Sequence, residues 1–225
     1  MTVFITGCSR GLGLEFTRQY LKRGERVFAS ARRPSDALLG LKKDYPDMVE
    51  LVTLDVTDPQ SISQARARAP KLDLLINNAG IYSGSSLPQP LGSLTMDDGL
   101  AVMGANALAP ILMAQAFRDL LPGGKIVSIS SLYGSISANK GSLPYHYGAS
   151  KAALNHYTRS LAAEVATERI IAIVMSPGWV RTDMGGPGAT LSPEESVAGM
   201  IKVIDRLTPE QSGEFLNWNG ASLPW

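Results

Sequence analysis

The chain has 225 residues, of which 44% are hydrophobic and 18% charged, a balance typical of globular proteins rather than disordered or fibrous ones. Its net charge of +1, with no basic block, gives no electrostatic reason to expect nucleic acid as a partner. One cysteine excludes an intramolecular disulfide, and with only two histidines beside it we expect no metal site. No uninterrupted run of about 18 apolar residues occurs, so we expect no membrane span and a cytoplasmic location.

Short runs rich in β-branched residues alternate with longer amphipathic stretches along the chain. Strands are predicted over residues 3–6, 26–30, 49–55, 72–77, 125–130, 170–176 and 213–217. Helices are predicted over 12–23, from Pro59, over 96–121 with a bend or break at Pro110, over 145–168, and from Ser192. This alternation predicts one α/β domain over residues 1–225, a Rossmann-type doubly wound parallel sheet of about seven strands.

A glycine-rich segment lies at the first strand-to-helix junction, where Gly7, Gly11 and Gly13 follow one another closely. Glycines allow a tight turn there and let backbone N–H groups approach a pyrophosphate at the helix N-terminus. A glycine triplet alone also fits an ordinary turn between a strand and a helix. Its place at the first βα junction favours nucleotide binding.

The spacing Gly-x-x-x-Gly-x-Gly resembles the nucleotide loop of the short-chain dehydrogenase/reductase family. Further motifs of that family are matched in order by Asp55-Val56, Asn77-Asn78-Ala79-Gly80, Asn106, Ser131 with Gly134, Tyr147-Gly-Ala-Ser-Lys151, and the segment from Pro177-Gly178 to Thr182. The resemblance covers nearly the whole chain. It implies a dinucleotide site formed by Gly7, Ser9, Arg10, Gly11, Leu12, Gly13, Arg32, Asp55, Val56, Asn78, Ala79, Gly80, Tyr147, Lys151, Pro177, Gly178, Val180 and Thr182.

Tyr147 and Lys151 are four residues apart, so on a helix they share a face. A free phenol has a pKa near 10, and a nearby ammonium is expected to lower it, which makes the pair a sensible acid and base. In isolation such a pair is more often an ordinary helix surface. Among the seven tyrosines, however, only Tyr147 has a lysine four residues on.

The resemblance implies roles for four catalytic residues. Tyr147 would protonate a carbonyl oxygen, and Lys151 would hold the nicotinamide ribose. Ser131 would donate a hydrogen bond to the substrate oxygen, and Asn106 would complete a proton relay through a water to Lys151. Ser130 is a rival for the serine role, but the x-x-Gly pattern favours Ser131.

The end of the second predicted strand indicates the nucleotide. An acidic residue there would favour NAD, but the chain has Ser30-Ala31-Arg32-Arg33. Arg32 is expected to pair with a 2′-phosphate, with Arg10 on its other side, which favours NADP(H). Two surface arginines would explain the same letters, and an NAD-linked alcohol dehydrogenase stays an alternative. Asp55 equally fits a cap before the turn at Thr57.

Substrate, a small carbonyl compound or alcohol, is expected between the 131–147 segment and the loop after Thr182. Tyr133, Tyr145, His146, Trp179 and Met184 are candidates to line it, and the aromatic residues among them alternatively fill the core. His146 is expected at the surface where its helix begins.

The length of the 131–147 segment, the ending 220–225 and the run from Trp179 to Pro187 narrow the resemblance to the C-factor and sniffer-type carbonyl reductase branch. This resemblance implies NADPH-dependent reduction of a carbonyl. The alternative is a C-factor-like signalling or regulatory protein that binds the nucleotide without essential turnover. Family members of this size usually pair through their two long helices, so a homodimer or homotetramer is expected.

Overall fold

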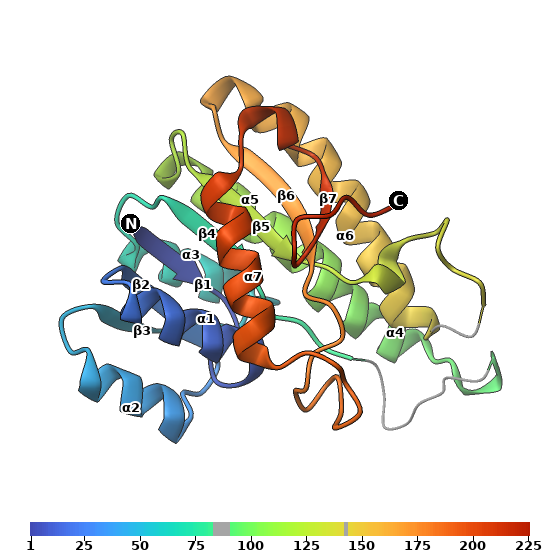
Figure 1. The fold of residues 1–225 in the computed structure, drawn as a ribbon, viewed down its shortest axis with the longest axis horizontal. Helices are drawn as coiled ribbons and strands as arrows, with labels where there is room; N and C mark the ends of the chain where they lie inside the picture. Colours follow the sequence, from blue (N-terminus) through green and yellow to red (C-terminus); the bar gives the residue numbers. More distant parts are fainter. Residues whose placement is uncertain (83–90, 142–143) are drawn as a thin grey trace.

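A parallel sheet forms the centre of the computed structural model, which describes residues 1–82, 91–141 and 144–225 (Figure 1). Within these ranges seven strands pair in the order β3-β2-β1-β4-β5-β6-β7, and every pairing is parallel. The strands are β1 Thr2–Ile5, β2 Arg26–Ala31, β3 Val49–Thr53, β4 Leu74–Asn77, β5 Lys125–Ile129, β6 Ile171–Ser176 and β7 Phe215–Asn217. The predicted doubly wound α/β fold is confirmed.

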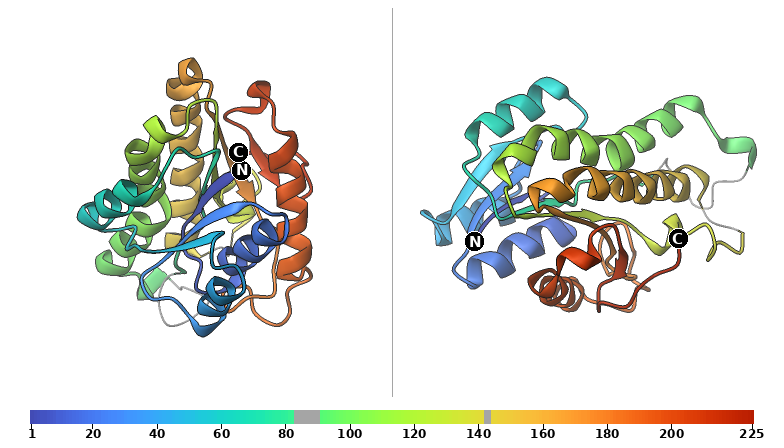
Figure 2. Two further views of the ribbon diagram at one scale, coloured as in Figure 1. Left: turned by 90° about the vertical axis from the view of Figure 1, so that its left-hand side faces the viewer. Right: turned by 90° about the horizontal axis from the view of Figure 1, so that it is seen from above.

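Helices cover both faces of the sheet (Figure 2). The apolar side chains of α1 Gly11–Lys22, α2 Asp36–Asp44 and α7 Pro193–Arg206 form a core against one face. Those of α3 Pro59–Arg68, α5 Ala109–Phe117 and the end of α6 Tyr145–Glu164 form a core against the other. The sequence missed α2, a short helix that Ser35 caps by accepting the N–H of Leu38 at 3.3 Å.

The helical run Met96–Leu120 is interrupted, as Pro110 led us to expect. α4 Met96–Met103 passes into a wider π-helical turn, Gly104–Leu108, and α5 starts just before Pro110. Proline lacks the N–H that would continue the regular ladder, which explains the break. By length and composition this run is, within the described ranges, the one helix that could cross a membrane. Half of its apolar window is buried inside the fold, as in a core helix of a globular protein.

The strand order reverses beside β1. The chain moves from β1 outward to β2 and β3, then returns to place β4 on the other side of β1. In such sheets a crevice opens where the loops after the two neighbouring strands diverge at their carboxyl ends. The loops after β1 and β4 carry the glycine segment and the Asn78-Ala79-Gly80 segment, which positions both at this edge.

Candidate active site

The turn after β1 requires glycine at two kinds of position. Gly7 and Gly11 have φ angles of 74° and 56°, in the left-handed region that favours glycine. At Gly13 a β-carbon would lie 2.2 Å from the carbonyl oxygen of Gly7. α1 then begins without a side-chain cap or an acidic residue in its first turn, as far as the described residues show. Its first N–H groups are therefore suited to an anion.

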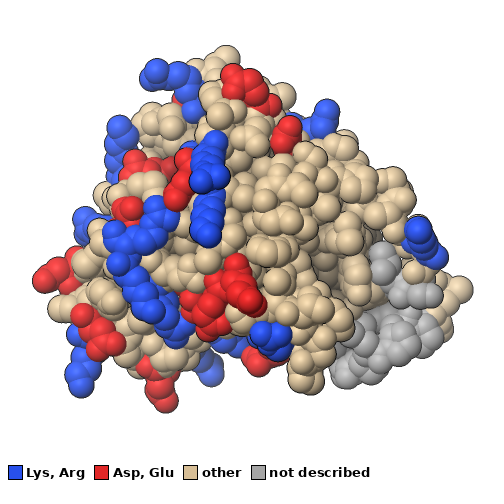
Figure 3. Space-filling view, in the orientation of Figure 1, with Lys and Arg blue, Asp and Glu red and all other residues tan. Residues whose placement is uncertain are grey.

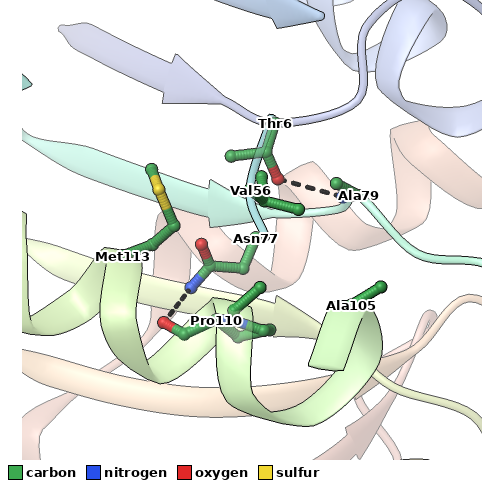
Figure 4. A pocket seen from close by; sticks show the side chains of 8 residues that line it. Thr6, Val56, Asn77, Ala79, Ala105, Pro110 and Met113 are labelled. Carbon is green, nitrogen blue, oxygen red and sulfur yellow. Dashed lines mark hydrogen bonds between the residues drawn. The ribbon is translucent and has the colours of Figure 1, made fainter. Parts of the chain in front are cut away.

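The loop after β4 is tied directly to this turn. The Thr6 hydroxyl accepts the N–H groups of Asn78 and Ala79 at 3.0 and 2.9 Å. The Asn78 amide donates to the carbonyl oxygens of Thr6 and Gly7 at 2.8 and 3.2 Å. Figure 4 shows a small pocket beside this loop, which is lined by Thr6, Val56, Asn77, Ala79, Ala105, Ala109, Pro110 and Met113. The pocket thus lies between the segment after β3 and the π-helical turn.

The segment after β6 approaches the glycine turn from the other side. Pro177 is anchored by the Ser196 hydroxyl, which donates to its carbonyl at 2.7 Å, and Gly178 has a φ of 77°. Val180 is buried and bridges to Leu191. The Thr182 methyl group lies 3.6 Å from where a β-carbon on Gly11 would stand. The Pro-Gly segment and the glycine turn therefore face each other.

The structure brings together some of the residues that were predicted to bind the adenosine end of the nucleotide. Asp55 accepts the N–H and hydroxyl of Thr57 at 2.9 and 2.7 Å, so the turn-capping interpretation of Asp55 is confirmed. These bonds, with a smaller effect of nearby Arg32, lower the pKa of Asp55. Arg32 is exposed, and Ser9 donates its hydroxyl to the carbonyl of Arg33. Leu12 packs against the core beneath the turn.

Arg10, predicted to stand on the other side of the 2′-phosphate from Arg32, makes an ion pair with the loop after β6. Its guanidinium pairs with the Asp183 carboxylate at 3.0 Å, and both side chains are more than three-quarters exposed. An exposed ion pair contributes only about 0–1 kcal/mol, so this contact is easily exchanged for another anion.

Ser131, Tyr147 and Lys151 meet at the carboxyl end of β5. The Ser131 hydroxyl lies near enough to the Tyr147 phenol to lower its pKa, and it accepts the N–H of Tyr133 at 3.2 Å. The Lys151 ammonium lies 5.7 Å from the centre of the Tyr147 ring and donates to the carbonyl of Ile129 at 2.7 Å. Tyr147 and Lys151 both lie on the buried face of α6. The predicted triad is therefore one cluster.

Asn106 lies in the π-helical turn, fully buried. Its amide exchanges hydrogen bonds with the backbone of Ile81, both 2.8 Å, and donates to the Ser150 hydroxyl at 3.1 Å. A β-carbon at Gly80 would lie 3.1 Å from the Asn106 carbonyl oxygen and 3.7 Å from the Lys151 ammonium. Gly80 thus keeps the space between Asn106 and Lys151 open.

Burial sets the protonation of the pair. It raises the pKa of Tyr147 to about 12, against a lowering by the Ser131 hydrogen bond, and it lowers the pKa of Lys151 to about 8. The pKa of Tyr147 is therefore raised by burial and not lowered, contrary to the prediction. The ammonium points to the Ile129 carbonyl, and neighbouring rings exclude water from the phenol, so desolvation dominates.

Those neighbouring rings belong to Tyr82 and Tyr133. Their centroids lie 4.6 and 6.3 Å from that of Tyr147. Sequence reasoning missed Tyr82, although an aromatic residue so soon after Gly80 was a usable signal. Burial raises the pKa of Tyr82 to about 12.

The remaining candidates for the substrate side differ in how exposed their side chains are. The large exposed side chains include Tyr133, Tyr145, Trp179 and Met184, so the core-filling alternative is wrong for the three aromatic residues. His146 is half-buried, and its imidazole packs against Gly99 of α4, so its expected surface position is also wrong. Ser130 is buried and donates to Asn155 at 2.6 Å, which turns it away from Tyr147.

Comparisons with known proteins agree with this geometry. A family model of short chain dehydrogenases matches residues 1–190. The C-signal protein of Myxococcus xanthus is 41% identical over 157 residues, covering 68% of this chain and 93% of that protein. The structure of NADPH-bound carbonyl reductase from chicken fatty liver is 36% identical, with a TM-score of 0.91 and coverage of 100% and 98% of the two chains.

Carbonyl reductase Sniffer of Drosophila melanogaster is similar over the same extent. It is 30% identical, with a TM-score of 0.93, covering 100% of this chain and 99% of that one. The predicted resemblance is confirmed: the chain belongs to the short-chain dehydrogenase/reductase family of oxidoreductases, in its C-factor and sniffer branch.

Proposed function

We propose that the protein is an NADPH-dependent reductase of aldehydes or ketones, with Tyr147 as the general acid. The observation that carries this proposal is the contact between the Ser131 hydroxyl and the Tyr147 phenol, one helical turn from Lys151. The buried phenol keeps its proton at neutral pH, since its pKa is about 12, and a proton donor is what a carbonyl oxygen requires.

The chain's own residues fit NADP(H). The uncapped N-terminus of α1 and the glycine turn suit a pyrophosphate, and the end of β2 carries Arg32 rather than a carboxylate. Asn78, Ala79 and Gly80 line the route to Lys151, where the ribose of the nicotinamide would be held. The nucleotide supplies the hydride that reaches the carbonyl carbon. The NADPH-bound relative from chicken supports this assignment.

The proton is handled by the Ser131–Tyr147–Lys151 cluster. Tyr147 donates its phenolic proton to the carbonyl oxygen, while the Ser131 hydroxyl donates a hydrogen bond to the same oxygen and stabilises its developing charge. Lys151 stays cationic below a pKa of about 8, and its ammonium then stabilises the phenolate left behind. Asn106 lies in the π-helical turn, across the gap at Gly80 from Lys151. In this proposal it completes the proton relay, through a water to Lys151, that returns the proton to Tyr147.

Tyr147→Phe tests the proposal directly. We expect kcat for NADPH oxidation with a panel of aldehydes and ketones to fall by about 100-fold or more, while the Kd of NADPH changes little. Tyr157→Phe is the matched control, since Tyr157 lies on the same helix, ten residues beyond Tyr147. Full activity in Tyr147→Phe would overturn the assignment.

The distribution of charged side chains on the surface favours an uncharged substrate. In Figure 3 the charged side chains gather over α1 and α2 and along α7, whereas the surface over β7 and α6 is largely free of them. Trp179 and Met184, in the loop after β6 where the substrate is expected, are apolar and exposed. The substrate panel should therefore begin with neutral, apolar carbonyl compounds.

A signalling role is the second candidate, favoured by the identity with C-signal. It predicts that NADPH binds while no carbonyl compound in a broad panel is turned over. An NAD-linked alcohol dehydrogenase would instead bind NADH more tightly than NADPH.

The partner that we propose is a second copy of the chain, bound through the long helices. Leu100, Leu108 and Leu112 lie along the outside of the 96–120 helical run, 39–62% exposed. Leu108→Glu should dissociate the assembly in size-exclusion chromatography with light scattering. Leu39→Glu, at an equally exposed leucine of α2, should not. A cytoplasmic location and a single nucleotide-binding domain over residues 1–225 complete the proposal.

A further inference from the structure

Asn155 lies on the same face of α6 as the catalytic pair, eight residues beyond Tyr147 and four beyond Lys151. It is only 3% exposed. A buried amide is costly unless its carbonyl oxygen and its NH₂ group both find partners. Its partners therefore show what the residue does.

Both partners flank Ser131. The Asn155 carbonyl oxygen accepts the hydroxyl of Ser130 at 2.6 Å, and its NH₂ group donates to the carbonyl of Gly134 at 3.2 Å. Ser130 immediately precedes Ser131, and Gly134 ends the short 3₁₀ turn that the Ser131 hydroxyl caps. One side chain of α6 thus holds both ends of the serine turn.

The back of the same turn rests on α6. A β-carbon at Gly134 would lie 2.7 Å from the carbonyl carbon of Lys151 and 2.9 Å from its β-carbon. The turn therefore touches the helix at Lys151 and cannot move closer. Contact at Gly134 fixes its distance from the helix, and the two Asn155 hydrogen bonds fix its position along the helix.

We propose that Asn155 is a positioning residue that holds the Ser131 hydroxyl against the Tyr147 phenol. This inference rests on the proposed function, in which Ser131 and Tyr147 act on the carbonyl oxygen. It requires an asparagine in particular, because the site needs one acceptor for a hydroxyl and one donor for a carbonyl. Aspartate lacks the donor, and leucine lacks both.

A double-mutant cycle tests the proposal. Asn155→Ala should lower kcat for carbonyl reduction by about 10- to 100-fold, with the Kd of NADPH within about twofold of the wild type. In a Ser131→Ala background the same substitution should lower kcat by no more than about twofold, because the group that it positions is already gone. An equal loss in both backgrounds would show a merely structural role and overturn the inference.

A pH profile gives a second readout. The Ser131 hydrogen bond lowers the pKa of Tyr147, so losing it should move the Tyr147 limb of kcat/KM, which lies above the Lys151 limb near pH 8, to higher pH. Asn155→Ala and Ser131→Ala should shift that limb alike. Thr158→Val is the control: Thr158 is buried on the same helix, and its hydroxyl has no hydrogen-bond partner in the part of the chain that the structure describes. It should leave both the limb and kcat unchanged.

Folding and function can be told apart in the same set. If Asn155→Ala does not yield folded protein, Asn155→Ser, which keeps a short donor and acceptor, should give a smaller loss of kcat with the same direction of pH shift. If Tyr147→Phe and Ser131→Ala retain activity, the proposed function itself fails. If they lose activity while both Asn155 variants keep it, only the positioning role of Asn155 fails.

Discussion

The ring of Tyr82 lies 4.6 Å from the ring of Tyr147, tilted by 39°. Tyr82 follows β4, whereas Tyr147 begins the buried face of α6, so the contact joins the nucleotide side of the sheet to the catalytic helix. The ring of Tyr133 lies edge-on to that of Tyr147, with the centroids 6.3 Å apart. Tyr147 as a whole is 9% exposed. Tyr82 therefore covers part of the Tyr147 ring, the side chain that we propose as the proton donor.

Tyr82→Ala is expected to lower the pKa of Tyr147. Burial is the main cause that raises this pKa to about 12, and removing a covering ring readmits water. Reduction needs both a cationic Lys151 and a protonated Tyr147, so activity falls first as pH rises through the Lys151 pKa of about 8 and again through the pKa of Tyr147. The second of these limbs in the kcat/KM profile should thus move to lower pH in Tyr82→Ala and move less in Tyr82→Phe, which keeps the ring. An unmoved limb in both variants would show that Tyr82 does not cover the phenol in solution.

Lys151 should make stability depend on pH. Burial lowers its pKa from 10.5 to about 8, so between these values the unfolded chain binds more protons than the folded one. The free energy of unfolding contributed by Lys151 therefore rises with pH across this window and is least favourable below it. Lys151→Met should be more stable than the wild type at pH 7, by about 1–3 kcal/mol, and should lose that advantage by about pH 10.5.

Urea unfolding of both proteins at several pH values would measure this difference. Other titrating groups contribute equally to the two proteins and cancel. A difference between wild type and Lys151→Met that stays constant from pH 7 to 10.5 would contradict the lowered pKa. Carbonyl reduction should be lost in the variant at every pH, since Lys151 belongs to the proposed catalytic cluster.

Arg32 is expected to select the nucleotide. Arg32→Asp should raise the Kd of NADPH by about 10- to 100-fold and leave that of NADH unchanged or lower, because a guanidinium pairs with a 2′-phosphate and a carboxylate repels it. Arg33→Asp is the matched control, being adjacent and also exposed. Equal effects of the two substitutions would indicate a general charge effect. Nucleotide titrations by fluorescence quenching would distinguish the outcomes.

Much of the fold could be predicted because it follows from local patterns. β-branched runs indicated all seven strands of the described sheet, and Pro110 indicated the break in the 96–120 helical run. α2 escaped because its sequence, DALLGLKKD, is short and contains a glycine, and because its cap, Ser35, is a common loop residue. Short helices of this kind form because tertiary packing of Leu38 and Leu41 stabilises them.

The parts of the site that could not be predicted depend on contacts between distant segments. Motif spacing gave the identities of Ser131, Tyr147 and Lys151, but not the ring of Tyr82 on the phenol. Nor could it give the direction of the pKa shift of Tyr147, which depends on how much water the fold excludes. The ion pair of Arg10 with Asp183 could not be predicted for a similar reason, since the two residues become neighbours only when the loops after β1 and β6 meet.

Trp225 is predicted to stabilise the part of the 131–147 segment that contains Ser135 and Ser137. Residues 221–223 run along the edge of β7 through backbone bonds from Asn217 to Ala221 at 2.8 Å and from Leu223 to Phe215 at 2.8 Å. The indole then lies between Phe215 at 5.7 Å and the guanidinium of Arg159 at 5.3 Å. Its main-chain oxygen accepts the hydroxyls of Ser135 and Ser137 at 3.1 and 2.6 Å.

Trp225→Ala should therefore affect substrate binding more than nucleotide binding. Losing the ring contacts is expected to lower the free energy of unfolding by about 1–3 kcal/mol and to raise KM for the carbonyl compound severalfold. The Kd of NADPH should not change, because the glycine turn lies at β1, away from this edge of the sheet. Trp225→Phe, which keeps an aromatic ring against Phe215, should recover most of KM. A rise in the Kd of NADPH equal to the rise in KM would instead mean that the whole sheet edge is disturbed.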